Sequence, residues 1–265
     1  MSLTLTVIIV NYNAGDYLKK AIESVKNFCS VDHEIIVVDN ASTDDSLEKT
    51  EGAKIIRLEN NIGFGPANNV GIKHSRGKYI LFLNPDAELL PGAIEGMMET
   101  LKEDKVGAVS CLLIYGNGEF QPSFGLFDKG IIGEFFDKFL AHTLLRLYVK
   151  QKKKPFPVKW ISGAVLMTKK EVLEKAGVFD PDFFLYMEDV DLCKRMRKAG
   201  YTLMVNPRCK CIHHLGKSSD RGRAFIEAKK SQLYYYRKWK GPLQNWLIRN
   251  YLRFRLGRNF QKIIK

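Results

Sequence analysis

Two acidic motifs, about a hundred residues apart, contain the side chains best suited to chemistry. Asn84-Pro85-Asp86 follows the apolar run 79–83, and Glu188-Asp189-Val190-Asp191 opens a basic helical segment. A carboxylate at the carboxyl end of a buried strand lies where open α/β sheets bind ligands, and there it can hold a hard cation against a diphosphate. A carboxylate at a helix start can act as a general base. Together the two motifs supply the minimum needed to move a group off a nucleotide.

Strand and helix patterns alternate along the chain and would position these acids. Apolar, β-branched runs predict strands over 4–10, 34–38, 54–58, 78–83, 106–114 and 160–167. Helical spacing predicts helices over 16–28, 66–74, 91–103, 171–176 and 189–199, and residues 43–45 are typical of a further helix start. Short loops between such elements predict right-handed βαβ units and a Rossmann-like, mostly parallel sheet. Because Asp39 and Asp86 each follow a strand, we expect both at one edge of that sheet.

The net charge of +13 is concentrated in the last quarter of the chain. Residues 205–265 contain sixteen Lys and Arg against two acids, a net charge of +14, whereas residues 1–204 carry a net charge of −1. A neutral body with a strongly basic tail predicts an acidic surface as the partner of the tail. Nucleic acid would attract the same charge, but no nucleic-acid-binding motif occurs, and we predict no such partner.

Cysteine usage and hydropathy indicate a cytoplasmic protein. The five cysteines form no CxxC pair, and the spacing of Cys209 and Cys211 beside His213 does not suit a tetrahedral zinc site, so reduced thiols are the simpler interpretation. No apolar run approaches the roughly 20 residues that span a bilayer. The N-terminus lacks the basic region, apolar core and cleavage site of a signal peptide.

Seven short motifs occur in the order found in family 2 glycosyltransferases, and the chain resembles the rhamnosyltransferase-like branch of that family over residues 5–220. The motifs are VIIVNYN (7–13), VVDNASTDD (37–45), NIGFGPANN (61–69), NPDA (84–87), WISGA (160–164), FLYMEDVDL (184–192) and HHLGKS (213–218). The resemblance implies a GT-A fold and inverting transfer of a sugar from a nucleotide-diphosphate donor, assisted by Mg²⁺ or Mn²⁺.

The resemblance also implies a set of donor-binding residues. Asp39 corresponds to the acid that hydrogen-bonds the pyrimidine ring, with Val10 and Tyr12 flanking the base. Asn61, Gly63 and Asn68 would shape the nucleotide pocket, where glycine permits close backbone approach. Asn84 and Trp160 complete the set, Trp160 as a packing residue or a sugar platform.

Metal and catalytic roles carry over in the same way. Asp86 corresponds to the metal-binding last acid of the family's Asp-x-Asp motif, whose first position is Asn84 here, and His213 is a second candidate ligand or a diphosphate contact. Asp189 corresponds to the catalytic base, and Glu188 would position Asp189 or the acceptor.

Each of these residues also has a structural interpretation. An acid after a strand is often a turn former or helix cap, which fits Asp86 taken alone. Glu188 and Asp189 alone would suit a helix start stabilised by its dipole. His213 alone could equally be a structural residue. Only the co-occurrence of the motifs favours a catalytic site.

We therefore expect a GT-A catalytic domain over 1–220, an amphipathic insert at 130–154 and a basic helical tail over 221–265. The Phe/Leu stripe at 131–147 suits either a core or a membrane-facing helix. In the tail, Leu243, Leu247, Tyr251 and Phe254 share one helical face. This composition suits an anionic membrane surface, and the alternative is a solvated appendage that forms a homodimer.

The predicted function is transfer of rhamnose from dTDP-rhamnose to a cell-surface saccharide or lipid-linked acceptor, by an enzyme peripheral to the inner face of the cell membrane. A UDP-hexose or UDP-N-acetylhexosamine donor is the alternative within this class. A sugar nucleotidyltransferase would need a basic glycine-rich loop after the first strand, which residues 11–15 do not supply. A non-catalytic polysaccharide- or membrane-docking protein on a degenerate GT-A fold is disfavoured by the intact Asp39, Asp86 and Asp189.

Overall fold

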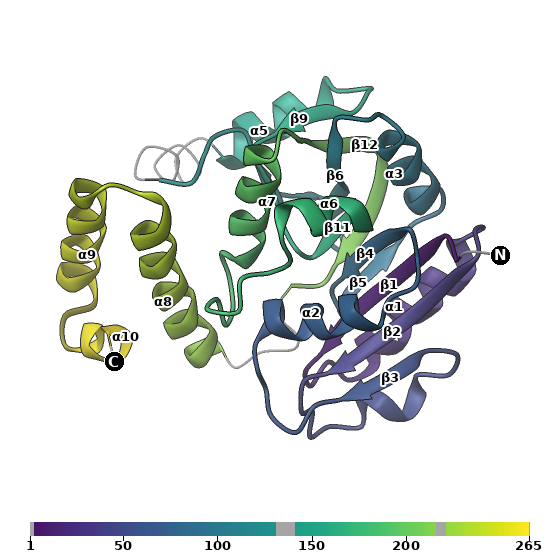
Figure 1. Ribbon diagram of the computed structural model, residues 1–265, viewed down its shortest axis with the longest axis horizontal. Helices are drawn as coiled ribbons and strands as arrows, with labels where there is room; N and C mark the ends of the chain where they lie inside the picture. Colours follow the sequence, from purple (N-terminus) through teal and green to yellow (C-terminus); the bar gives the residue numbers. More distant parts are fainter. Residues whose placement is uncertain (1–2, 131–140, 216–220, 265) are drawn as a thin grey trace.

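A ten-stranded sheet forms the centre of the molecule, and helices cover both of its faces (Figure 1). The computed structural model describes residues 3–130, 141–215 and 221–264. Its strands run in the order β3-β2-β1-β4-β11-β6-β12-β5, with β7 paired to β6 and β9 paired to β12. A separate two-stranded sheet joins β10 to β8.

The first half of the chain forms the predicted parallel βαβ units. Its strands are β1 (Leu5–Asn11), β2 (His33–Asp39), β3 (Lys54–Arg57) and β4 (Tyr79–Leu83). Its helices are α1 (Asp16–Phe28), the single 3₁₀ turn η1 (Ser46–Lys49) and α2 (Phe64–His74). Strand β1 pairs in parallel with both β2 and β4, so the carboxyl ends of these strands share one edge. The predicted mostly parallel sheet is confirmed.

The second half of the chain extends the sheet with strands of both directions. It contains β5 (Ala87–Leu89), α3 (Ala93–Leu101), β6 (Val106–Ile114), β7 (Phe120–Gln121), β8 (Phe124–Gly125), α5 (Ala141–Lys150), β9 (Phe156–Val158), β10 (Trp160–Ile161), β11 (Val165–Lys169), α6 (Lys170–Ala176), α7 (Glu188–Lys198) and β12 (Thr202–His213). Strand β11 is antiparallel to its neighbours β4 and β6, whereas β12 is parallel to β6.

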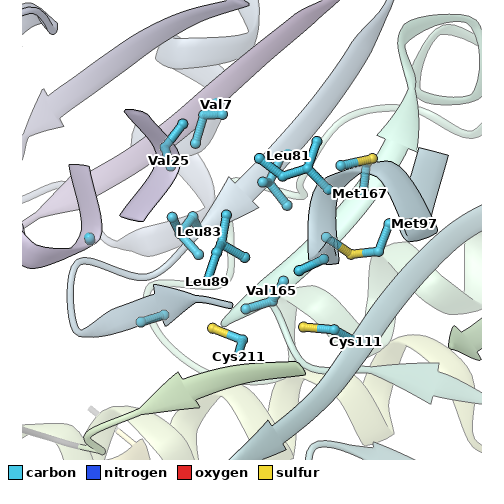
Figure 2. Close-up of a cluster of buried hydrophobic side chains, with 14 of the residues drawn as sticks. Val7, Val25, Leu81, Leu83, Leu89, Met97, Cys111, Val165, Met167 and Cys211 are labelled. Atoms are coloured by element: carbon cyan, nitrogen blue, oxygen red, sulfur yellow. The ribbon is translucent and has the colours of Figure 1, made fainter. Parts of the chain in front are cut away.

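The alternating side chains of the central strands divide the core into two layers. Val7 and Ile9 of β1 pack with α1 and α3, while Ile8 and Val10 pack on the opposite face with α2, α6 and α7. Successive strand residues point to opposite faces, and because both faces of this strand are buried its central run, residues 7–10, is apolar throughout. Figure 2 shows the first layer, in which Val25 of α1 and Met97 of α3 lie over the sheet.

Two predicted elements are wrong, and one long strand was not predicted. The strand predicted over 160–167 is two strands in different sheets, because residues 162–164 leave the strand to bond elsewhere: the Ser162 amide donates to the Ser123 carbonyl and the Gly163 amide to Asp189. Residues 43–45 precede the 3₁₀ turn rather than starting a helix. Strand β12 was not predicted, since a register shift between Asn206 and Lys210 interrupts its pattern.

The stripe predicted over 131–147 falls largely outside the described residues, namely Ile131, Ile132, Phe135, Phe136, Phe139 and Leu140. Within α5, Leu144 and Leu147 are exposed and Val149 is buried. No helix in the described ranges is long and apolar enough to cross a membrane.

The C-terminal segment folds into helices that pack beside α7, at the yellow-green end of Figure 1. They are α8 (Arg221–Trp239), α9 (Pro242–Leu256), the turn η2 (Gly257–Phe260) and α10 (Gln261–Ile264). Tyr235 and Tyr236 are fully buried in a third cluster with Phe183 and Val190, so α8 is joined to the preceding domain by a core of its own.

Candidate active site

The ends of β1 and β2 are held together by a network of amide and carboxylate side chains. The buried Asn11 side chain donates to Asp39 Oδ1 at 2.9 Å and to the hydroxyls of Ser42 and Ser46 at 3.0 and 2.8 Å. Asp39 Oδ2 accepts from the Ser42 amide at 3.3 Å. Asp39 is itself buried, and its position at the end of β2 is the one predicted for it.

Asn40 connects this strand end to the glycine-containing loop that precedes α2. Its amide nitrogen donates to Asn61 Oδ1 at 2.9 Å and to the Gly63 carbonyl at 3.2 Å, and its Oδ1 accepts from the Ile62 amide. Asn61 Oδ1 also accepts from the Gly63 amide at 3.0 Å. We call Asn11, Asp39, Asn40, Asn61 and Gly63 the strand-end network. Asn11 and Asn40 were not among the predicted site residues, although they flank the strand ends where such residues are expected.

Gly63 allows the strand-end network to touch the segment before α7. Its φ of +94° is left-handed, and a Cβ there would lie 2.3 Å from the Phe184 carbonyl oxygen. That same carbonyl accepts from the Phe64 amide at 2.8 Å. Only glycine adopts this φ without strain and also leaves room for the Phe184 carbonyl. The loop that contains Gly63 can therefore contact the segment before α7 only with glycine at this position.

The other predicted donor-binding residues occupy different environments. Val10 is buried in the second core layer, and Tyr12 is half-buried just beyond β1. Asn68 is buried within α2, and its side-chain nitrogen donates to the Phe64 carbonyl one turn earlier.

Asp86 and His213 come together from strands far apart in the sequence. Antiparallel pairing of β5 with β12 places His213 opposite Ala87, and the Asp86 Oδ1 lies 3.2 Å from the His213 Nε2. The Asn84 side-chain nitrogen lies 3.2 Å from the same imidazole nitrogen. Asp86 and His213 are both buried.

Gln121 determines which nitrogen of His213 carries the proton. The Gln121 side-chain nitrogen donates to the His213 carbonyl at 3.3 Å, which leaves Gln121 Oε1 as an acceptor 2.8 Å from His213 Nδ1. With Oε1 as the acceptor, the Nδ1 of the imidazole is the donor, and its Nε2 faces Asp86 and Asn84. Such an outer partner commonly orients a metal-ligating histidine. Gln121 was missed from the sequence because β7, which contains it, has only two residues.

The pair Asp86 and His213 fits a divalent cation. Ligands about 2.1 Å from an octahedral ion are about 3 Å apart, close to the 3.2 Å between the Asp86 and His213 atoms. No group of three or more His, Cys, Asp or Glu side chains suited to a metal occurs among residues 3–130, 141–215 and 221–264. Asp86 and His213 alone would therefore fill only part of the coordination sphere of such a cation.

Glu188 and Asp189 open α7 after two residues with left-handed backbone. Tyr186 and Met187 have φ of 68° and 69°, which is unusual for side chains of this size. This sharp reversal turns the first helical turn toward residues 162–164. The Gly163 amide donates to Asp189 Oδ2 at 2.9 Å, and the Val190 amide donates to Asp189 Oδ1 at 2.7 Å.

Residues 163 and 164 join the two acidic motifs. While Gly163 bonds to Asp189, the neighbouring Ala164 carbonyl accepts from the Asn84 amide at 2.8 Å. Two adjacent residues therefore contact the two motifs: Ala164 bonds to the motif that contains Asp86, and Gly163 bonds to Asp189. The structure brings together the two motifs that the sequence separates by about a hundred residues.

Burial raises the pKa of both carboxyls in this pair. The pKa of Glu188 is well above its usual range, because the side chain is enclosed and Asp189 adds a second negative charge. Burial also raises the pKa of Asp189, opposed by the Gly163 and Val190 amides and the positive charge of Lys129. Glu188 Oε2 has no hydrogen-bond partner within the described residues. A buried carboxyl pair of this kind is typical of a catalytic acid–base site.

Trp160 is a packing residue with one face toward a cation. Its indole nitrogen is buried against Gly125 without a partner in the described ranges, and the Lys129 ammonium lies 4.2 Å from its ring centroid. Lys129 was also missed from the sequence, since a single lysine in a loop gives no signal. Its charge acts on both Trp160 and Asp189.

The third acid of the second motif serves a different purpose. Asp191 is fully buried and accepts from the Arg195 side chain at 2.8 Å and the Trp239 indole at 2.7 Å, and it lies 2.7 Å from the Lys238 ammonium. Two of these partners belong to α8. Asp191 therefore fixes the C-terminal helices to α7.

The sequence of the chain matches a known protein family. Residues 6–176 match the family model described as glycosyl transferase family 2. The chain is 26% identical to the N-acetylglucosaminyl-diphospho-decaprenol L-rhamnosyltransferase of Mycobacterium tuberculosis, over 96% of this chain and 92% of that protein. It is also 26% identical to rhamnosyltransferase WbbL of Escherichia coli, over 78% of this chain and 82% of that protein.

Solved structures show the fold. The mannosyltransferase PcManGT from Pyrobaculum calidifontis, in complex with GDP-Man and Mn²⁺, aligns with a TM-score of 0.65 and 17% identity over 100% of this chain and 73% of that one. S. aureus TarS 1–349 in complex with UDP-GlcNAc aligns with a TM-score of 0.60 and 18% identity over 98% and 73%. These similarities show the predicted GT-A fold, and the match of the family model shows that the chain belongs to glycosyl transferase family 2.

Proposed function

We propose that this glycosyltransferase moves L-rhamnose from dTDP-rhamnose to a saccharide linked to a lipid diphosphate, with inversion at the anomeric carbon. The observation that supports it is the joining of a candidate cation site, Asp86 with His213, to a buried carboxyl pair through residues 163–164. The choice of sugar and acceptor comes from relatives whose names specify rhamnosyl transfer and a diphospho-decaprenol acceptor.

In this proposal the strand-end network binds the nucleoside of the donor. Asp39, fixed by Asn11 and Ser42, faces the pyrimidine ring, with Val10 and Tyr12 beside it. The loop containing Asn61 and Gly63 closes over the nucleotide. Because these polar side chains already hold one another in place, little ordering remains to be done when the donor binds.

Asp86 and His213 would hold Mg²⁺ or Mn²⁺, with Asn84 beside them. The remaining coordination positions would be filled by oxygens of the donor diphosphate and by water. When bound, the cation would neutralise the charge that develops on the leaving diphosphate.

Asp189 acts as the general base. Its carboxylate takes the proton of the acceptor hydroxyl while that oxygen forms a bond to the anomeric carbon and the bond from that carbon to the diphosphate oxygen breaks. Attack from the face opposite the leaving group inverts the configuration. The Gly163 and Val190 amides hold the Asp189 oxygens in a fixed orientation, and Glu188 supports this arrangement from the enclosed side.

A UDP-linked hexose or N-acetylhexosamine is the second candidate donor. It is favoured by the TarS structure in complex with UDP-GlcNAc and by the GalNAc-T7 structure with UDP, GalNAc and Mn²⁺, which has a TM-score of 0.65 and 17% identity over 88% of this chain and 50% of that one. No side chain described above reads a particular sugar hydroxyl, so the relatives rather than the geometry favour rhamnose.

We place the reaction at the inner face of the cell membrane, where a lipid-linked acceptor is found. The C-terminal region carries a net charge of +14 over residues 205–265. This charge would draw the enzyme to anionic lipid.

Nucleotide binding tests the proposal first. Calorimetry with dTDP, UDP and GDP, with and without Mn²⁺, should show Mn²⁺-dependent binding of dTDP that is lost in Asp86→Ala. Preference for UDP would transfer the proposal to the second candidate donor. Failure of all three nucleotides to bind would refute the transferase mechanism proposed here.

A further inference from the structure

Helix α9 turns an apolar face toward solvent. Leu243, Trp246, Leu247, Tyr251 and Phe254 recur at helical spacing along one side, and all five are exposed. Phe254 is 90% exposed, Leu243 69% and Trp246 61%. A contiguous apolar face of this size on a surface helix marks an interaction site.

The protein's own packing fixes this face outward. On the opposite side of α9, Ile248 and Leu252 are buried in the cluster that contains Tyr235, Tyr236 and Phe260. Rotating α9 to bury the outer residues would expose these two side chains. The helix therefore uses one apolar side to join α8 and leaves the other exposed.

The stretch of chain that forms the outer face is basic, although Arg249 also lines a larger hollow that contains Asp182 and Glu227. Residues 228–265 contain eleven Lys and Arg and no Asp or Glu. Arg249, Arg253 and Arg255 of α9 are all exposed. Arg249 and Arg253 also line a hollow of about 320 Å³ with Trp246 and Phe260, and no carboxylate is among its lining residues.

The geometry points to an anionic phospholipid surface as the partner of α9. The aliphatic and aromatic side chains would enter the boundary between headgroups and acyl chains, while Arg249 and Arg253 would meet lipid phosphates beside the hollow. A protein partner would have to supply many carboxylates around an apolar groove, whereas an anionic bilayer supplies both by its nature. This inference deepens the proposed function and rests on it only in the choice of a membrane as the place of reaction.

The attachment of α8 connects this surface to the catalytic acids. The Ser231 hydroxyl donates to the Leu185 carbonyl at 2.8 Å, and Lys238 lies 2.5 Å from Asp180 Oδ2 and 2.7 Å from Asp191 Oδ1. Residues 180–191 contain the Glu188–Asp189 pair. A membrane bound to α9 would thus lie at a defined position relative to the base.

Vesicle co-sedimentation of the full chain tests this inference without any sugar donor. We expect the wild type to sediment with phosphatidylcholine vesicles containing 30% phosphatidylglycerol at low salt, to sediment much less with pure phosphatidylcholine, and to be released by high salt. The double variant Leu243→Ser with Phe254→Ser should lose at least tenfold of this binding. Arg249→Gln with Arg253→Gln should lose the preference for anionic lipid.

Matched controls separate the α9 face from general effects. Phe127→Ser removes an aromatic side chain that is 52% exposed elsewhere, and Lys54→Gln with Lys105→Gln removes two exposed charges from the catalytic domain. Both should bind vesicles like the wild type, and all variants should keep the thermal unfolding midpoint. Equal vesicle binding by the wild type and the Leu243/Phe254 variant would overturn the inference.

Light scattering tests whether a second copy of the chain, rather than a membrane, covers the exposed face of α9. A wild-type dimer that becomes a monomer in the Leu243/Phe254 variant, with no vesicle binding by either, would assign the face to a second copy and overturn the inference. Since nucleotide binding is measured separately, an enzyme that binds dTDP but not vesicles would refute the role of α9 and leave the proposed transfer standing.

Discussion

In the strand-end network each polar side chain is hydrogen-bonded to another, and the one enclosed atom without a partner among its described residues is a neutral amide oxygen, Asn11 Oδ1. On the far side of the site the enclosed atom without a described partner belongs to an ionisable carboxyl, Glu188 Oε2. Both sides contain left-handed backbone, at Gly63 in the network and Ala41 beside it, and at Tyr186 and Met187 before the Glu188–Asp189 pair. Satisfied polar groups stabilise a shape, and unsatisfied buried charges raise the free energy of the folded state. We infer that one side provides a fixed binding surface and that the other keeps a reactive group at some cost in stability.

The largest effect should follow from changing the base. Asp189→Asn keeps the size of the side chain but cannot accept a proton, so we expect kcat to fall about 10²–10⁴-fold. Donor affinity should stay within about twofold, because the strand-end network is untouched. Turnover by a radiolabelled or coupled assay, with calorimetry for the donor, measures both.

Asp191→Asn is the matched control for that substitution. It lies two residues on, but its charge holds Arg195, Lys238 and Trp239 in a buried cluster. Removing one member of a buried charged cluster typically costs about 3–5 kcal/mol. The midpoint of thermal unfolding should therefore drop sharply in Asp191→Asn and stay unchanged in Asp189→Asn. Similar behaviour of the two variants would remove the distinction between reactive and structural acids.

A smaller effect is expected from loosening the cation site. Gln121→Leu removes the acceptor of the His213 Nδ1 proton, so the imidazole is free to adopt either tautomer. Outer partners of this type are commonly worth 10–100-fold in metal affinity. We expect the Mn²⁺ dissociation constant, measured by electron paramagnetic resonance with nucleotide present, to rise within that range. Gln121→Glu keeps an acceptor at the same position and should retain most of the affinity, and equal loss in both variants would contradict the tautomer argument.

Weakening the strand-end network should change the measured binding constant by about the same factor as loosening the cation site, or by less. Asn40→Ala removes three hydrogen bonds that hold residues 61–63 against the end of β2. Each such bond is worth about 0.5–1.5 kcal/mol, so nucleotide affinity should fall by roughly tenfold while kcat at saturating donor changes little. A fall in kcat with unchanged affinity would reverse the roles assigned to the two sides.

The smallest effects concern pH. Burial raises the pKa of Asp189 above its ordinary 3.8, so kcat should decline as pH falls through a value higher than that of an exposed aspartate. The pKa of Glu188 is raised in the folded protein, which means that the folded state binds this proton more tightly than the unfolded chain. The contribution of Glu188 to the free energy of unfolding therefore declines as pH rises from its unfolded pKa through its folded pKa.

Glu188→Gln isolates that contribution. Because the neutral amide does not titrate, the variant should unfold at a higher temperature than the wild type near neutral pH, and the difference should shrink as pH is lowered. Calorimetric unfolding at several pH values measures this dependence. A variant less stable than the wild type at every pH would show that the buried Glu188 charge does not destabilise the fold.

Most of the first half of the fold could be predicted from the sequence. The strands and helices up to Leu83 follow from local apolar patterns, and α1 and β6 begin and end at the predicted residues. Strand β12 and the short strands around the site could not be predicted, since they form by pairing with distant segments rather than by their own periodicity. For the same reason the positions of Gln121 and Lys129 beside the candidate site were not predicted, whereas the predicted positions of Asp39, Asp86 and Asp189 at strand and helix ends followed from local patterns.

The sequence by itself determined which residues follow each strand, where α7 begins and which side chains share a face of α9, because these depend on local periodicity and turn chemistry. Only the tertiary structure decided that His213 meets Asp86, that Asp191 serves α8 rather than the site, and that the Leu243–Phe254 face of α9 points outward. Those outcomes depend on contacts between segments far apart in the sequence or on competition between two apolar faces, and neither leaves a pattern in the local sequence.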